Sequence, residues 1–169
     1  MPKEPRSFAF VEAQLRKKTF GVLSTIGPGG SSQTTGILYA LSPPGAPFRL
    51  YVLTERSYLK ARNVSRNPQV SFLVPYPHHL LPFVPASCIS FSAVAEILPP
   101  DDPGGREAFT ANRILRMNLE EADAMEDGIF LRIRPKRSMH CYGIGFGLVT
   151  IARNPAVCGY SVAIPPDRS

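Results

Sequence analysis

The sequence predicts a mainly β protein, built as a closed or nearly closed antiparallel barrel of six to seven strands with helices around it. Short β-branched and apolar segments follow one another in the first half, separated by Gly/Pro turns such as 27–30 and 42–45. The strands are mostly sequential, with the longer helical pattern near 106–126 in one crossover, whereas an α/β sheet alternates strands and helices regularly. The length of 169 residues favours one domain, expected to cover 1–169.

The helices can be assigned from capping signals and periodicity. Helical spacing behind the N-cap residue Ser7 predicts a helix over 7–17, so that residues 1–18 form an N-terminal helix or arm. A short helix is predicted near 56–66, and the longer one near 106–126 has about five turns.

The strands are assigned from alternation, β-branched residues and the turns that end them. They are predicted at residues 19–26, 31–41, 48–54, 69–74, 88–98, 128–134 and 138–144. A strand near 147–151 is a further option, and residues 152–169 are expected to form a C-terminal tail. Residues 75–86, with four prolines, are expected to form an irregular loop.

Positive charge is concentrated in the first half of the chain. Lys and Arg outnumber Asp and Glu by 19 to 13, which gives a net charge of +6. Residues 1–95 carry 10 basic and 3 acidic side chains, whereas residues 96–169 carry 9 and 10. We therefore expect the first half to bind an anionic partner, although charge alone does not choose among nucleotide, phosphate ester, nucleic acid and membrane surface.

Several classes of protein are excluded by composition. No apolar run approaches the roughly 18 residues that span a bilayer, and the N-terminus is too polar for a secretory signal. Cys88, Cys141 and Cys158 are an odd number without C-x-x-C spacing, which argues against a disulfide framework or a zinc site. The expectation is a cytoplasmic protein with no metal and no membrane partner.

The densest polar cluster lies where the third predicted strand runs into the second predicted helix. The first N–H groups of a helix are unpaired and its dipole is positive there, so an anion is favoured. Arg56, Lys60 and Asn63 have the spacing of one helix face, and Thr54 and Ser57 add hydroxyl groups suited to phosphate oxygens. The alternative is a solvated basic face on an ordinary surface helix.

Three segments in this part of the chain, GVLSTIGPGG, SSQTTGILYAL and RLYVLTERSYLKARNVSRNPQVSFLV, together resemble a known family. Their order is similar to the flavin-binding split-barrel superfamily typified by pyridoxamine 5'-phosphate oxidase, and the spacing of Thr54, Lys60 and Asn67-Pro68 resembles its Thr…Lys…Asn-Pro block. The resemblance covers about residues 10–75 and continues more loosely to about 145. It implies an antiparallel split β-barrel of Greek-key type.

The resemblance also implies a homodimer that holds FMN in the groove between its two barrels. The implied cofactor-binding residues are Thr54, Arg56, Ser57 and Lys60 around the phosphate, and Gln33, Thr34, Thr35 and Gly36 along the ring. Related barrels bind an 8-hydroxy-5-deazaflavin coenzyme in the same groove and others handle haem, so both are alternative cofactors.

The chain departs from the family pattern at several places. Tyr58 and Leu59 stand where many members carry Ser or Arg before the lysine, and the chain has no Trp. Synthesis of pyridoxal phosphate is therefore not expected. The resemblance implies an FMN-dependent oxidoreductase for an unidentified small organic substrate, with no catalytic residue assigned. The alternatives are a deazaflavin-dependent reductase, a non-catalytic flavin- or haem-binding protein and, ranked last, a nucleic-acid-binding protein.

Three histidines and a basic strand remain as further candidates. His78 and His79, in the loop 75–86, either cover a substrate or belong to an exposed loop. His140 lines the flavin groove, ligates haem or is a hydrogen-bonded strand histidine. The alternating basic residues over 132–137 either reach an anionic ligand at an interface or form the solvated face of a strand.

Overall fold

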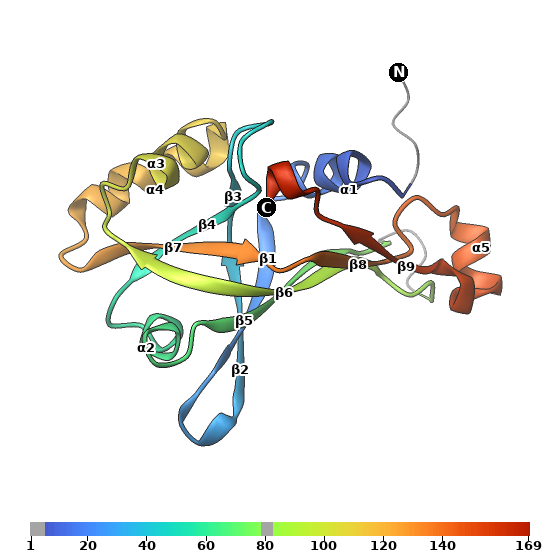
Figure 1. Cartoon of the computed structure of the whole chain (residues 1–169), viewed down its shortest axis with the longest axis horizontal. Coiled ribbons are helices and arrows are strands. Elements are labelled where there is room, and N and C mark those ends of the chain that lie inside the picture. Colours follow the sequence, from blue (N-terminus) through green and yellow to red (C-terminus); the bar gives the residue numbers. More distant parts are fainter. Residues whose placement is uncertain (1–5, 79–82) are drawn as a thin grey trace.

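The structure is a computed structural model that describes residues 6–78 and 83–169. One antiparallel sheet curls into a half-barrel, with helices packed at its ends and on its outer side (Figure 1). The strands in the described residues are β1 (Phe20–Ile26), β2 (Ser32–Leu38), β3 (Ala40–Leu41), β4 (Leu50–Glu55), β5 (Gln69–Tyr76), β6 (Ser87–Leu98), β7 (Gly128–Pro135), β8 (Ser138–Tyr142) and β9 (Gly159–Ala163). The helices are α1 (Phe8–Leu15), α2 (Leu59–Arg66), α3 (Pro103–Thr110), α4 (Arg113–Ala124) and α5 (Leu148–Arg153). The predicted fold class, a mainly β antiparallel barrel with helices around it, is confirmed.

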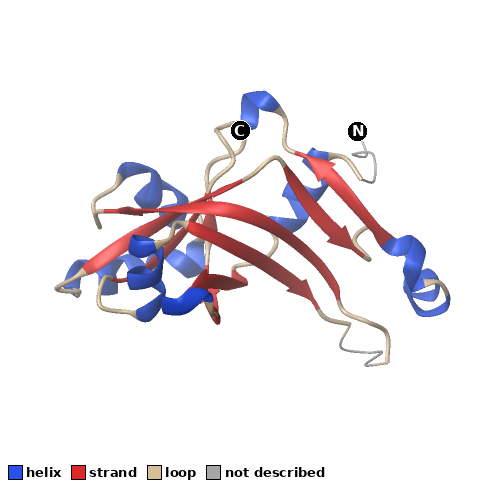
Figure 2. Cartoon of the chain, turned by 60° about the horizontal axis from the view of Figure 1, so that its bottom comes forward, coloured by secondary structure: helices blue, strands red, loops and turns tan. Residues whose placement is uncertain are grey.

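The long strand β6 organises the sheet. The strand order is β2-β1-β5-β6-β7-β4-β3, and β8 with β9 continues from β6 outside this path. One edge of β6 pairs with β5, while its other edge pairs with β8 over Cys88–Ser90 and with β7 over Ala93–Leu98. The strands therefore diverge from β6 into two lobes, and Figure 2 shows them crossing as the sheet twists.

The main hydrophobic core lies inside the curl of the sheet. Leu23, Phe72, Ile89 and Leu131 are buried there, and α1 covers it with Val11 and Leu15. The described side chains of a second cluster lie between the outer side of the sheet and the helices α3 and α4; they are Ala40, Tyr51, Ala108, Phe109, Leu115, Leu119 and Phe130. These two clusters fix β4 from both faces, because its residues alternate between them.

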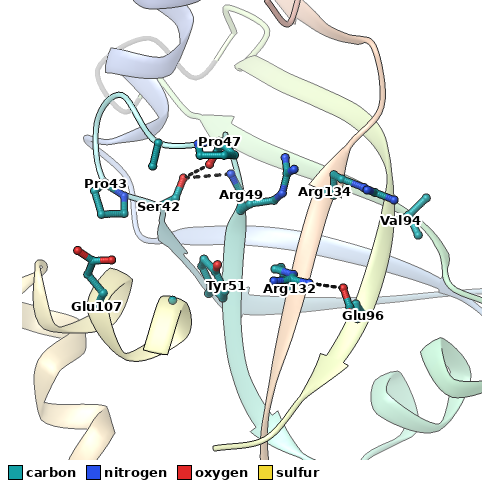
Figure 3. Close-up of a pocket in the computed structure, with 12 residues that line it drawn as sticks. Ser42, Pro43, Pro47, Arg49, Tyr51, Val94, Glu96, Glu107, Arg132 and Arg134 are labelled. Carbon is teal, nitrogen blue, oxygen red and sulfur yellow. Dashed lines mark hydrogen bonds and ion pairs between the residues drawn. The ribbon is translucent and has the colours of Figure 1, made fainter. Parts of the chain in front are cut away.

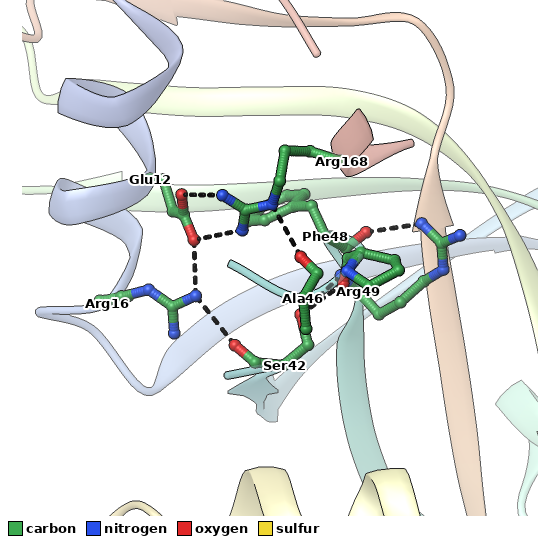
Figure 4. A network of polar contacts seen from close by, with 8 residues as sticks. Glu12, Arg16, Ser42, Ala46, Phe48, Arg49 and Arg168 are labelled. Atoms are coloured by element: carbon green, nitrogen blue, oxygen red, sulfur yellow. Dashed lines mark hydrogen bonds and ion pairs between the residues drawn. The ribbon is translucent and has the colours of Figure 1, made fainter. Parts of the chain in front are cut away.

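A network of charged groups ties the C-terminal segment to α1 (Figure 4). Arg168 donates two hydrogen bonds to the Glu12 carboxylate, at 2.9 and 3.2 Å, and its Nε donates to Ala46 O at 2.7 Å. Arg16 also pairs with Glu12 and donates to Ser42 O at 2.8 Å. The network thereby holds the loop before β4 in place.

The structure corrects several predicted elements. The long helix near 106–126 is two helices, because the Asn112 side chain accepts hydrogen bonds from the N–H groups of Ile114 and Leu115 and starts α4. The predicted strand 31–41 is interrupted at Tyr39, whose hydroxyl turns inward and donates to Leu15 O at 2.8 Å.

Two further corrections concern the C-terminal part. The optional strand near 147–151 is wrong, because α5 begins at Leu148. The predicted tail 152–169 contains β9, which pairs with all of β8 and so extends the sheet. No helix within the described residues has the length and apolar character needed to cross a membrane.

Candidate functional site

Two adjoining pockets lie between β2, the end of β4 and the start of α2. The first, about 270 Å³, is lined by Thr25, Gln33, Thr34, Thr35, Tyr58, Leu59 and Lys60. The second, about 380 Å³, is lined by Gly36, Ile37, Leu38, Leu53, Thr54, Glu55, Tyr58, Lys60, Phe109, Asn118 and Met125. Because both share Tyr58 and Lys60, they form one continuous region, which we call the β2–α2 site. It brings together six of the predicted cofactor-binding residues: Gln33, Thr34, Thr35, Gly36, Thr54 and Lys60.

Asn63 holds the β2–α2 site together from behind. This side chain of α2 is wholly buried, and its Nδ2 donates to Thr25 Oγ1 at 3.0 Å and to Gln33 Oε1 at 2.6 Å. It therefore fixes the side chain of Gln33 and joins α2 to β1 and β2. The sequence pattern placed Asn63 on the same helix face as Lys60. In the structure Lys60 lines the pocket, whereas Asn63 is buried behind it.

Lys60 supplies the positive charge of the site. Its Nζ lies 4.6 Å from the centroid of the Tyr58 ring, a cation–π distance. Burial lowers the pKa of Lys60 below its usual value, and the nearby Glu55 carboxylate offsets part of that shift. The ammonium forms no ion pair with the residues that the structure describes, so it is available to an anion.

Thr54 supplies a buried hydroxyl that lacks a partner. Its Oγ1 is fully buried and makes no hydrogen bond within residues 6–78 and 83–169, and the residue lines the second pocket. Because an unpaired buried polar group is unfavourable, such an atom beside a pocket indicates a ligand that completes its hydrogen bonding. The N-cap position of α2, Tyr58, makes no side-chain capping bond with the described residues, so the first turn of α2 is also left uncapped.

Arg56 and Ser57 lie apart from the pocket walls. The predicted helix near 56–66 begins only at Leu59, because the residues before it form a turn tied to Asp127. The Arg56 N–H donates to Asp127 O at 3.0 Å, and the Ser57 N–H donates to the Asp127 carboxylate at 2.9 Å. The Ser57 hydroxyl faces Glu55, 3.4 Å away. Their contact with a cofactor phosphate stays a prediction.

Exposed apolar side chains surround the β2–α2 site. Phe20, Leu38, Tyr58 and Leu59 each keep more than two-fifths of their surface exposed. A Cβ added to Gly36 would lie 2.9 Å from the Phe20 ring, so this glycine allows the ring to lie across β2. A cluster of large exposed apolar groups around a pocket is typical of a ligand site or an interface. The sequence reasoning did not assign Tyr58, Leu59 or the α4 wall to the site.

The histidines lie elsewhere in the fold. His78 Nε2 is 3.1 Å from Ser87 Oγ, and His79 lies outside the described residues. His140 is exposed on β8, with Nδ1 2.8 Å from Ser161 Oγ. It lines a separate pocket of about 630 Å³ together with the basic residues Arg49, Arg134, Lys136 and Arg137. Among the described residues no group of three or more His, Cys, Asp and Glu could hold a metal ion.

Solved structures of similar shape support the fold. HutZ, the haem storage protein of Vibrio cholerae, superposes with a TM-score of 0.67 at 17% identity, over 83% of this chain and 97% of that one. The haem-binding protein of Mycobacterium smegmatis superposes with a TM-score of 0.66 at 17% identity, over 94% of this chain and 59% of that one. The conserved hypothetical protein Rv2991 of Mycobacterium tuberculosis superposes with a TM-score of 0.58 at 25% identity, over 79% of this chain and 82% of that one.

Sequence comparison gives the family. No curated protein sequence matches the chain. The family model described as pyridoxamine 5'-phosphate oxidase matches residues 9–140, which include β1 to β7, most of β8 and the whole β2–α2 site. With the antiparallel half-barrel and its order of strands, this match shows that the chain belongs to the pyridoxamine 5'-phosphate oxidase-like split-barrel superfamily.

Proposed function

We propose that the protein is an FMN-binding flavoprotein that acts as an oxidoreductase on a small organic substrate. The observation that carries the proposal is that Lys60 and Thr54 line the same pocket of the β2–α2 site. Lys60 offers an ammonium without an ion-pair partner among the described residues, and Thr54 a buried hydroxyl likewise unpartnered there. A phosphate monoester satisfies both groups, since it is anionic and carries several acceptor oxygens.

The rest of the site fits the ring of a flavin. Gln33, Thr34 and Thr35 present polar groups along β2, which pairs with β1 on one side. Tyr58, Leu59 and Phe20 supply apolar surface of the kind that covers an aromatic ring. When bound, the flavin would supply hydride or electron transfer, while these residues bind it, orient it and exclude water.

We also propose that the site is completed by a second copy of the chain. The two pockets, about 270 and 380 Å³, are open and lie at the lower end of the range for small-molecule sites. The exposed Phe20, Leu38, Tyr58 and Leu59 around them would be covered in a dimer with the cofactor at its interface. A mass measurement in solution, such as size-exclusion chromatography with light scattering, is expected to give twice the chain mass.

The identity of the chromophore tests the proposed function. The purified protein is expected to show a flavin spectrum, or to acquire one on addition of FMN, and the chromophore released by unfolding is expected to be FMN by mass spectrometry. Release of a deazaflavin would favour a deazaflavin-dependent reductase instead. A protein that binds neither would refute a flavin function. Oxidation of reduced nicotinamides by the FMN-loaded protein then separates an enzyme from a flavin carrier.

Haem binding is the second candidate function, and His140 is the observation that favours it. Its Nδ1 is held by Ser161 at 2.8 Å, whereas Nε2 has no hydrogen-bond partner among the described residues. The pocket beside it is the largest of those described, about 630 Å³, and contains Lys136 and Arg137, which would suit propionate groups. Haem bound there would supply an iron centre, with His140 as the residue to hold it.

Titration with haemin tests this candidate. Stoichiometric binding with a Soret band that His140→Ala abolishes would support it, whereas His78→Ala serves as a matched control because His78 lies beside Ser87 outside that pocket. A spectrum unchanged by His140→Ala would exclude His140 as the ligand.

A further inference from the structure

A further polar pocket lies on the outer face of the sheet, away from the β2–α2 site, and it shares Arg49, Val94 and Arg134 with the pocket of His140. It measures about 340 Å³ and is formed where β4 and β7 run side by side under the start of α3 (Figure 3). Arg49, Arg132 and Arg134 line its sheet side, and Glu107 lies on the helix side. We call it the arginine pocket. None of the eight predicted cofactor-binding residues lines it.

The register of the sheet explains why three guanidinium groups meet there. Arg132 lies opposite Tyr51 on β4 and opposite Glu96 on β6, while Arg134 lies opposite Val94. Arg49 directly precedes β4, and the register of Leu50 opposite Ile133, continued by one residue, places it opposite Arg134. Side chains two residues apart on a strand share one face, so all three arginines emerge on the outer side.

Only one of these three arginines is neutralised within the described residues. Arg132 forms an ion pair of 2.6 Å with Glu96. Arg49 and Arg134 form no ion pair within residues 6–78 and 83–169, and Arg49 donates from its side chain to Phe48 O at 2.9 Å. Burial lowers the pKa of Arg49, and the charges of Arg134 and Arg132 lower it further. The fold therefore holds like charges together with two guanidinium groups unpaired, which an anion would relieve.

The walls of the arginine pocket restrict the kind of anion. Guanidinium groups match phosphate oxygens geometrically and can bind them through two parallel hydrogen bonds. Glu107 on the opposite wall repels a second anionic group but accepts hydrogen bonds from hydroxyl or amino groups. A volume of about 340 Å³ suits a small metabolite better than a polymer.

We propose that the arginine pocket binds a phosphorylated small molecule, with its phosphate at Arg49 and Arg134 and its hydroxyl groups towards Glu107. This site is separate from the β2–α2 site. Arg49 directly precedes β4 and Thr54 lies near its end, and five residues of extended chain correspond to about 17 Å. The proposal does not depend on flavin binding.

Calorimetric titration with ribose 5-phosphate at constant ionic strength tests the proposal, with ribose and inorganic phosphate as reference ligands. Ribose 5-phosphate is expected to bind more tightly than either one. Arg134→Gln, at an exposed position where misfolding is not expected, should weaken binding about tenfold or more, as should Arg49→Gln. Glu107→Gln should reduce the preference for ribose 5-phosphate over inorganic phosphate.

Two control variants make the result decisive. Arg116→Gln removes the same charge from an exposed position on α4 that lines none of the described pockets, and it should leave binding unchanged. Lys60→Ala should also leave ribose 5-phosphate binding unchanged while it weakens FMN binding. Equal weakening by Arg116→Gln would mean general charge attraction, and loss in Lys60→Ala would assign the phosphate to the β2–α2 site. Either result, or no difference between ribose and ribose 5-phosphate, overturns the proposal.

Discussion

Asn63 Nδ2 donates a 2.6 Å hydrogen bond to Gln33 Oε1, so a wholly buried side chain of α2 positions a pocket-lining side chain of β2. The same nitrogen also donates to Thr25 Oγ1 on β1 at 3.0 Å. One amide thus connects three elements, and the shape of the β2–α2 site depends on it.

Asn63→Ala is expected to lower the free energy of unfolding by roughly 1–3 kcal/mol, because it leaves the buried Thr25 hydroxyl without this partner. It should also weaken FMN binding, since Gln33 loses its anchor. Chemical denaturation and flavin titration measure the two effects. Ser65→Ala, on the exposed side of α2, should change neither. Full FMN affinity in Asn63→Ala would contradict a positioning role.

Lys60→Ala is expected to weaken FMN binding roughly 10- to 100-fold, as typical for loss of a charge-assisted hydrogen bond. Fluorescence quenching of free FMN on titration with protein measures it. Arg66→Ala removes a cation from the same helix but not from the pocket and should have little effect. Because the pKa of Lys60 is lowered by burial, affinity should begin to fall at a lower alkaline pH than an ordinary lysine would give. An affinity unaffected by Lys60→Ala would place the phosphate elsewhere.

Thr54→Val and Thr25→Val are expected to change stability in opposite directions. Valine at 54 removes an unpaired buried hydroxyl from a β-strand, so the free protein should become more stable by about 1 kcal/mol while FMN binding weakens. Valine at 25 removes a hydroxyl that is bonded to Asn63, so stability should fall. Thermal unfolding with and without FMN measures both. Destabilisation by Thr54→Val would indicate that its hydroxyl is already satisfied.

Arg168→Gln is expected to destabilise the protein by roughly 1–3 kcal/mol at neutral pH, because it leaves a buried carboxylate with one partner fewer. Burial raises the pKa of Glu12, but hydrogen bonds from Arg168 and Arg16 outweigh that effect and hold it below its ordinary value. A depressed carboxyl pKa contributes stability above the unfolded-state pKa, and this contribution is lost as the pH falls through the folded-state pKa.

The cost of Arg168→Gln should therefore shrink below about pH 4. Denaturation curves at neutral and acidic pH measure this difference. Lys17→Gln, at an exposed position next to Arg16, is the control, and its effect should be small at both pH values. A cost that does not change with pH would mean that packing of Arg168, including its contact with Phe8, dominates.

The sequence predicted where most strands lie and which side chains gather at the junction of Thr54 and Lys60, because both follow from local patterns. Gln33, Thr34, Thr35 and Gly36 were expected only from the resemblance to a known family, and the pairing of β4 with β7 was not predicted. Turn residues and alternation locate strands, and the Thr54–Lys60 spacing spans a single strand-to-helix junction. The positions of Arg56 and Ser57 could not be predicted in this way, because they depend on Asp127, which lies 70 residues beyond Ser57 in the chain. No local pattern reports that contact.

The arginine pocket illustrates the same limit. Alternating basic residues over 132–137 were visible in the sequence, and a solvated strand face was one of the two interpretations. Only the antiparallel register of β4 against β7 brings Arg49 beside Arg134. Register depends on the whole sheet, so charges that look unrelated in the sequence form one cluster in the fold.

The sharing of β6 between two lobes has a consequence for how the molecule unfolds. Both β7 and β8 pair with this one strand, so the β7–β4 side and the β8–β9 side each lose their connection to the rest of the sheet once β6 has separated. We expect the lobes to melt together in one cooperative transition, with amide hydrogens at the centre of β6 among the slowest to exchange with solvent.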